Sequence, residues 1–249
     1  MININALTHY TQQLLQVDRF KDYCPNGLQV EGKREIRKIV TGVTASMALL
    51  EAALQNGADA ILVHHGYFWR NEDPRVVGIK RNRLAFLLKH DLNLAAYHLP
   101  LDAHATYGNN VQLAQVLNFE MEGFTGEPAI IAHGNLKETM SLHKLAQHIE
   151  KTLLRTPVTI GDMQKPIKKI AWCTGAAQGY LENAIDLGVD AFISGEISEQ
   201  TTHIALESGV SYISAGHHVT ERYGIKALGE HLAEIFQIEH QFIDIENPV

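Results

Sequence analysis

The feature that most constrains the fold of this chain is a stretch of sequence that occurs twice. Residues 36–39 (IRKI) correspond to 167–170 (IKKI), and residues 57–60 (GADA) correspond to 188–191 (GVDA), in each case 131 positions later. The correspondence needs no gap over about 30 positions, which chance rarely supplies. The alternative to a duplication is that the two units are unrelated and merely share Gly and Asp residues at corresponding positions. We therefore predict that the chain contains a duplicated structural unit.

Each copy has the pattern of a strand, a helix and a second strand. In the first copy, the segments 38–43 and 60–63 are apolar runs typical of strands, and 46–55 has a helical pattern. Short connections between such elements predict a βαβ unit on a parallel sheet. Each copy continues with a helix and another strand, at 92–97 in the first and 210–214 in the second. We therefore predict an α/β fold in which duplicated βαβ halves form the core.

The segment 126–165 interrupts this pattern. It contains a strand-like run at 129–131, a helical pattern from 142 to 154 and another short strand-like run. These elements indicate a small α+β insertion rather than a linker. We predict that residues 1–125 and 166–249 form the duplicated α/β core around it.

Composition excludes several classes of protein. A chain of 249 residues can bury a substantial core, so it needs no metal or disulfide merely to fold. Its two cysteines, Cys24 and Cys173, have no paired spacing, which excludes a disulfide framework and a Cys-rich zinc site. The net charge of -7 argues against binding of nucleic acid through phosphate neutralisation. With no signal-peptide pattern and no run of about 20 apolar residues, we expect a soluble, cytoplasmic protein without membrane contact.

Polar side chains follow the predicted parallel strands. His64 and His65 come directly after the strand at 60–63, and Asp102 follows the strand at 92–97. His217 and Glu221 follow the last of these strands and are four positions apart, so at a helix start they share one face. In open α/β sheets, ligands bind beyond the carboxyl ends of the strands. We therefore expect these five side chains to lie at one edge of the fold.

The five side chains have the chemistry of a metal site. Imidazole and carboxylate ligands without thiolate suit zinc, iron, manganese, cobalt or nickel. Five donors are more than one tetrahedral zinc usually takes from a protein, so we predict two divalent metal ions. Adjacent histidines can both be ligands only where the strand ends, and Gly66 permits that turn. Each cluster alone has a structural alternative: Asp102 could cap the following helix, and the histidines could be ordinary loop residues.

Several short motifs give the chain a resemblance to a known family. The motifs are 25–30 (PNGLQV), 63–66 (VHHG), 98–102 (HLPLD), 194–196 (SGE) and 215–221 (AGHHVTE). Together they resemble the family of GTP cyclohydrolase I type two, also called NGG-interacting-factor-three-like, and most closely its short bacterial members of the YbgI type. The resemblance covers essentially the whole chain.

This resemblance implies a dinuclear metal centre whose ligands are His64, His65, Asp102, His217 and Glu221. It also implies a toroidal homohexamer with the metal sites facing an interior cavity. The chain lacks the large inserted domain of the longer members, so the transfer of an activity from those relatives stays open.

The first functional hypothesis is a metal-dependent hydrolase that acts on a nucleotide or related heterocycle. The family name points to opening of the imidazole ring of GTP with release of formate, and two ions would generate the attacking hydroxide. His98, His104 and Glu196 are candidates for moving protons, although each could equally orient a metal ligand. The sequence leaves open the native metal, the substrate, the pathway and the identity of any bridging carboxylate.

The second hypothesis is a non-catalytic protein: a metal-binding ring, an adaptor or a metal-handling protein. The motif at 25–30 bears on this choice. If it lines the metal site, a substrate role gains support; if it is only a turn, as Asn26-Gly27 indicates, it decides nothing.

Overall fold

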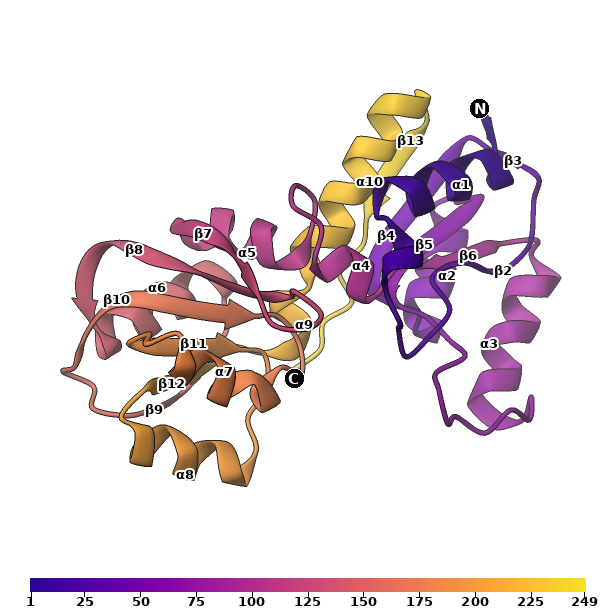
Figure 1. Ribbon diagram of the computed structural model, residues 1–249. Helices are drawn as coiled ribbons and strands as arrows, with labels where there is room; N and C mark the ends of the chain where they lie inside the picture. The colour runs from indigo at the N-terminus through magenta and orange to yellow at the C-terminus, as the bar shows by residue number, and fades with distance from the viewer. The chain divides into compact units, whose positions relative to one another are not determined.

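The computed structural model describes all 249 residues and divides them into two compact units (Figure 1). Unit 1 contains Met1–Tyr107 and Ile225–Glu246, and unit 2 contains Gly108–Gly224 and Asn247–Val249. One of the chain's passages between the units falls inside a continuous helix, α10 (Arg222–Phe236). Both units combine helices with a sheet, which confirms the predicted α/β class. None of the helices is both long enough and apolar enough to cross a membrane.

Unit 1 is built on a five-stranded sheet of order β13-β4-β5-β6-β2. Its strands are β2 (Gly27–Val30), β4 (Lys38–Thr44), β5 (Ala60–His65), β6 (Asn93–Ala96) and β13 (Glu239–Phe242). All run parallel except β2, which pairs antiparallel with β6. The ladder of β1 (Ile2–Asn3) with β3 (Glu35–Ile36) is separate. The helical segments of this unit are α1 (Ile4–Leu14), η1 (Val17–Arg19), α2 (Met47–Gln55), α3 (Gly78–Lys89) and α4 (Leu99–Asp102), together with most of α10.

Helices cover both faces of this sheet. Ile39 of β4 belongs to an apolar cluster with Leu7 of α1 and Leu228 of α10. The next residue, Val40, belongs to a second cluster with Leu49 of α2. Because side chains alternate along a strand, these clusters lie on opposite faces, and both faces are apolar. The ends of the strands are therefore where the polar side chains of a site can gather.

Unit 2 is built on a six-stranded sheet of order β7-β8-β10-β11-β12-β9. Its strands are β7 (Phe119–Thr125), β8 (Ile131–Ser141), β9 (Val158–Ile160), β10 (Pro166–Cys173), β11 (Ala191–Ser194) and β12 (Ser211–Ser214). The central three, β10 to β12, run parallel. The helical segments are α5 (Asn109–Leu117), α6 (Leu142–Leu153), η2 (Gln178–Tyr180), α7 (Leu181–Asp186), α8 (Glu199–Ser208) and α9 (His217–Thr220).

The segment 126–165 supplies strands on both sides of these three parallel strands. Its strand β8 pairs antiparallel with β10, and its strand β9 pairs antiparallel with β12. The helix between them, α6, packs on the sheet with α5, so that Leu113 and Ile149 share an apolar cluster with Trp172. The boundaries of core and insertion that the sequence predicts stay a prediction.

The two units repeat one arrangement of hydrogen bonds. The carboxylate of Asp59 accepts from the backbone N–H groups of residues 37–38 at 2.9 and 3.3 Å. The carboxylate of Asp190 accepts from those of residues 168–169 at 2.9 Å each. In both units this aspartate precedes the second parallel strand and ties it to the N-terminal part of the first. The recurrence at the same sequence offset supports the proposed duplication.

His240 on β13 is a partly buried imidazole whose neutral form stabilises unit 1. Its Nε2 lies 2.8 Å from the hydroxyl of Thr41, and a Cβ added at Gly229 would collide with the ring. Burial, together with the charge of Lys226, lowers the pKa of His240 to about 4. In the unfolded chain a histidine has a pKa near about 6.5, so between these two values the unfolded state binds more protons.

We therefore predict that neutral His240 contributes to stability fully above about pH 6.5, and that this contribution is lost as the pH falls toward 4. The variant His240→Gln can keep the hydrogen bond to Thr41 but cannot titrate. Its urea midpoint should fall less than that of the wild type between pH 7.5 and 4.5. Equal decreases in the two proteins would contradict the prediction.

Candidate metal centre

Three histidines of unit 1 gather at the carboxyl ends of β5 and β6. His64 and His65 are the last two residues of β5, and His98 follows β6 by two positions. Their ligand atoms all lie within 4.8 Å of one another. The turn after β5 begins at Gly66, where a Cβ would collide with the side chain of Gln29. The strand therefore runs two residues beyond the predicted end at Val63 and includes both histidines, while the expected turn follows at Gly66.

The imidazoles of His64 and His65 are held through Nδ1. In His64 this atom is 2.9 Å from the carbonyl oxygen of Tyr97, which can only accept, so Nδ1 carries the proton. In His65 the Nδ1 atom is 3.2 Å from the hydroxyl of Thr44. Nε2 is therefore the nitrogen that each ring can offer to a cation. Histidines that bind metals are oriented in this way by partners of the second nitrogen.

Asp102 lies beside this cluster. It ends α4, is 6% exposed, and has its Oδ1 atom 3.5 Å from Nε2 of His64. The next helix, α5, has Gly108 at its N-cap, so Asp102 does not cap it. A carboxylate at this depth is costly unless positive charge or hydrogen bonds compensate it. Carboxylate and imidazole at this spacing fit a divalent cation.

A second cluster lies in unit 2. Nε2 of His217 is 3.1 Å from the carboxylate of Glu221, and its Nδ1 is 2.7 Å from that of Glu196. Burial alone would lower the pKa of His217, but hydrogen bonds and charges of Glu221 and Glu196 outweigh burial and raise the pKa to about 9. This cluster therefore favours a positive charge, which a proton or a metal ion can supply.

Gly175 makes room for the pair in unit 2. Its φ of +70° is one that other residues rarely adopt, and a Cβ there would collide with the Glu221 carboxylate and lie 3.2 Å from Nε2 of His217. Its backbone N–H also donates to the hydroxyl of Thr220 at 3.1 Å. The sequence did not single out Gly175, because one glycine after a strand is an ordinary turn signal.

The three residues predicted to move protons have different surroundings. Glu196 holds Nδ1 of His217, and His98 lies in the unit 1 cluster. The Nδ1 atom of His104 instead accepts from the backbone N–H groups of Thr106 and Tyr107 at 3.2 and 3.0 Å, and its ring stacks on that of Tyr107. Burial lowers the pKa of His104. This geometry favours a structural role for His104, and the three catalytic roles stay predictions.

Two residues that were not predicted as site residues, Asp22 and Asn26, hold His98 in place. Its Nδ1 is 2.7 Å from the carboxylate of Asp22, and its backbone N–H donates to the side-chain oxygen of Asn26 at 2.7 Å. Asn26 belongs to the motif at 25–30, which therefore braces the histidine cluster, and the rest of the motif, from Gly27 on, is strand β2 rather than the turn that the sequence indicated. Asp22 gave no signal in the sequence, because an isolated aspartate in a polar loop has no informative spacing.

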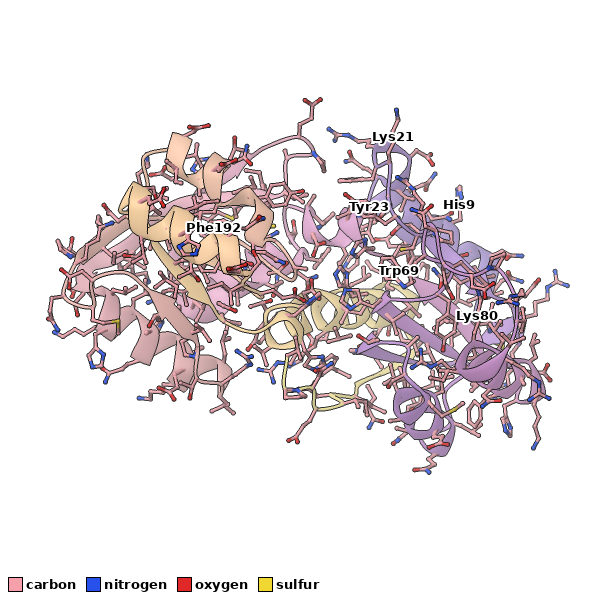
Figure 2. The ribbon with its side chains drawn as sticks, turned by 90° about the horizontal axis from the view of Figure 1, so that it is seen from below. His9, Lys21, Tyr23, Trp69, Lys80 and Phe192 are labelled. Carbon is pink, nitrogen blue, oxygen red and sulfur yellow. The ribbon has the colours of Figure 1, made fainter.

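Aromatic rings flank the same cluster. The ring of Trp69 is edge-on to that of His98, with centroids 5.0 Å apart, and the centroid of the Tyr23 ring lies 6.4 Å from that of His98. Figure 2 labels Tyr23 and Trp69 among the side chains of unit 1. Tyr23 is 53% exposed, and the guanidinium of Arg70 lies over its ring at 5.5 Å. This side of the cluster can therefore contact a planar ring and an anionic group.

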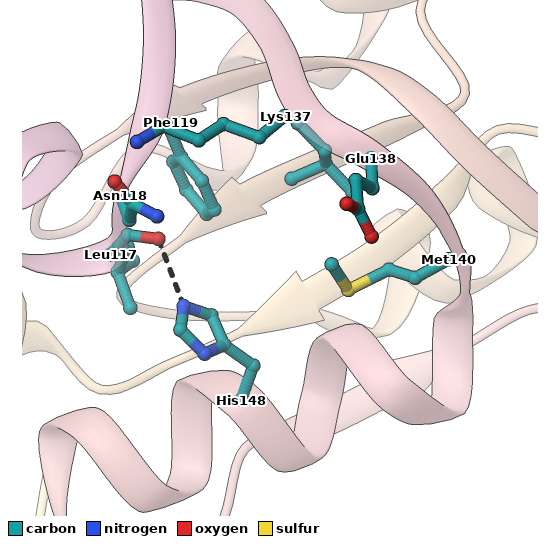
Figure 3. Close-up of a pocket in the computed structure, with 8 residues that line it drawn as sticks. Leu117, Asn118, Phe119, Lys137, Glu138, Met140 and His148 are labelled. Carbon is teal, nitrogen blue, oxygen red and sulfur yellow. Dashed lines mark hydrogen bonds between the residues drawn. The ribbon is translucent and has the colours of Figure 1, made fainter.

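Unit 2 also contains a cavity of about 260 Å³ that shares no residue with either cluster (Figure 3). It lies between β8, the start of β7 and α6, where Nε2 of His148 donates to the carbonyl oxygen of Leu117 at 2.8 Å. The cavity is lined by Leu117, Asn118, Phe119, Leu136, Lys137, Glu138, Met140 and His148.

Gly175 gives a direct test of the unit 2 geometry. We predict that Gly175→Ala lowers the free energy of unfolding by more than about 1 kcal/mol, because the backbone conformation and the Glu221 carboxylate both oppose a Cβ. Gly179→Ala is the matched control, since its Cβ would meet nothing within 4 Å. Urea unfolding measures both, and equal stability of the two variants would refute the collision.

The chain matches known proteins over its whole length. The sequence pattern of the family described as Duf34/NIF3 (NGG1p interacting factor 3) matches residues 2–248. A protein of Pseudomonas aeruginosa is 54% identical over 250 residues, with 99% of each chain covered, and one of Yersinia pestis is 53% identical with 100% of each covered. Both are named GTP cyclohydrolase 1 type 2 homolog.

Solved structures share the fold. Protein ybgI, described as of unknown function, is 48% identical with a TM-score of 0.97, and 100% of each chain is covered. A protein of Thermus thermophilus is 32% identical with a TM-score of 0.90, again with 100% of each chain covered. HcgD of Methanocaldococcus jannaschii, at 21% identity and a TM-score of 0.84, covers 98% of each chain and shows the fold alone.

Proposed function

The chain belongs to the Duf34/NIF3 (NGG1p interacting factor 3) family, and we propose that it is a metal-dependent hydrolase that acts on a nucleotide or a related heterocycle. The observation that carries the proposal is the orientation of His64 and His217. Each ring has Nδ1 engaged by an oxygen and Nε2 beside a buried carboxylate. Relatives that are more than half identical carry the name GTP cyclohydrolase 1 type 2 homolog, which favours a purine nucleotide as substrate.

We assign two divalent ions to His64, His65, Asp102, His217 and Glu221. The donors within each unit are imidazole nitrogens and carboxylate oxygens, which suit zinc, iron, manganese, cobalt or nickel. Burial, with the charge of Asp22, raises the pKa of the Cys24 thiol to about 12, so in the metal-free protein this cysteine is a neutral thiol near neutral pH. The donor set therefore fits the proposed ions without a sulfur ligand.

Divalent ions at such a site supply Lewis acidity and a hydroxide nucleophile at neutral pH. The chain's own residues then orient the ligands, receive the substrate and move protons. Of His98, His104 and Glu196, the last is best suited to proton transfer, because its side chain is 33% exposed and can exchange protons with water. Trp69 and Tyr23 offer aromatic surface to a planar base, and Arg70 offers a guanidinium to a phosphate.

Two further assignments follow from the family resemblance. We propose a toroidal homohexamer, which light scattering on the purified protein would test by mass. We also propose a cytoplasmic location, in keeping with the expectation from sequence that no segment enters a membrane.

Metal content tests the proposal. Untagged wild-type protein should carry about two ions per chain by plasma mass spectrometry, and Asp102→Ala should lose metal because a buried carboxylate ligand is removed. Asp18→Ala, at an exposed aspartate of the same unit, is the matched control and should retain the wild-type content.

A wild-type protein that contains almost no metal, and takes up none on titration, would refute the metal centre. Bound metal without turnover of GTP or other nucleotides would instead favour the second candidate, a non-catalytic adaptor or metal-handling protein. A screen for release of formate and of phosphate separates the two.

A further inference from the structure

His98 lies inside the histidine cluster of unit 1, although the five predicted metal ligands do not include it. Its ring centroid is 5.1 Å from that of His64 and 5.7 Å from that of His65. The ligand atoms of all three residues are within 4.8 Å of one another, a spacing that ligands of one ion or of two adjacent ions can adopt. The parallel pairing of β5 with β6 produces this convergence, because Val63 and Ala96 are paired just before the histidines.

Asp22 fixes the orientation of the His98 ring. Its side chain is only 3% exposed, and its two oxygens accept four hydrogen bonds. The donors are Nδ1 of His98 at 2.7 Å, the side chain of Asn26 at 2.8 Å, and the backbone N–H groups of Tyr23 and Leu99 at 2.6 and 2.9 Å. A carboxylate so engaged holds the proton on Nδ1 and leaves Nε2 as the coordinating nitrogen of His98.

We propose that His98 is a third metal-binding imidazole of unit 1, and that Asp22 is the residue that positions it. The inference rests on the proposed function only in that the same cluster must bind divalent ions. His98 matches His217 in construction: each ring has Nδ1 at 2.7 Å from a carboxylate oxygen. A carboxylate in this position raises the basicity of the ligand and fixes the ring that presents it.

A different group of donors involves the same histidine. The ligand atoms of Asp22, Cys24 and His98 also lie within 4.8 Å of one another. Both oxygens of Asp22 are already occupied by N–H groups, one of them Nδ1–H of His98 itself. These contacts assign the ion to the side of the ring that faces His64 and His65.

Cobalt(II) is the probe for this proposal, because its visible absorption reports the number and kind of its ligands. The metal-free full-length protein is titrated with Co²⁺, and binding is followed by equilibrium dialysis and by the intensity and position of the absorption bands. His98→Ala should shift the bands and weaken binding of one ion, as loss of a ligand predicts, by more than the roughly 10- to 100-fold that loss of a ligand's hydrogen-bond partner costs. Asp22→Asn should also weaken binding of that ion and shift its absorption bands, by smaller amounts.

Two reference variants separate the possible failures. His9→Ala removes an exposed histidine of the same unit and should bind cobalt as the wild type does. His65→Ala removes a predicted ligand and should lose an ion. If His65→Ala loses an ion while His98→Ala keeps wild-type affinity and spectrum, His98 is not a ligand, and only this inference fails.

If the wild type itself takes up no cobalt, the proposed function fails as well. Thermal unfolding of the metal-free variants establishes that each is folded before titration. Should Asp22→Asn not fold, His98→Ala alone decides the assignment, since it leaves the other three bonds of the Asp22 carboxylate in place.

Discussion

The parallel pairing of β5 with β6 is the constraint on which the unit 1 site depends. Val63 pairs with Ala96, and the N–H group of Tyr97 donates to the carbonyl oxygen of Val63 at 3.0 Å. This register places His64 beside the Tyr97 carbonyl and His98 beyond the same edge. A shift of one residue would turn each side chain to the other face, where the apolar packing of α1 or α2 would oppose it.

Hydrogen bonds to Nδ1 then fix the orientation of the imidazole rings that this register brings together. The carbonyl of Tyr97 and the carboxylates of Asp22 and Glu196 each hold one imidazole, so the rings are ordered by the protein itself. An arrangement fixed before binding loses less entropy when a cation arrives, which increases affinity without an additional contact. The carboxylates also make both clusters electrostatically suited to a cation, as the raised pKa of His217 shows in unit 2.

Strong local patterns made much of this arrangement predictable from the sequence. The strand at β4, the helix α2 and the histidine pair at the end of β5 were expected within one or two residues, because periodicity and caps are local. Asp22 was missed because its partner His98 is 76 positions away and no spacing rule links them. The passage between units inside α10 carried no signal either, since a helix that continues through a boundary keeps its ordinary pattern.

The duplicated arrangement explains how one backbone framework carries two kinds of chemistry. By the sequence offset, Glu196 corresponds to His65, and Gly175 corresponds to Thr44, whose hydroxyl contacts His65. In unit 2 the strand-end side chain is a carboxylate that holds His217, and the glycine makes room for Glu221. The fold thus places corresponding positions at the carboxyl ends of the parallel strands in both units. The side chain at each position decides whether it can bind a cation or orient a ligand. Glu196 thus occupies the position of a predicted ligand but has one oxygen engaged by His217, while its other oxygen accepts from the Gln178 amide at 3.4 Å. The proton transfer proposed for Glu196 would use this second, more weakly held oxygen.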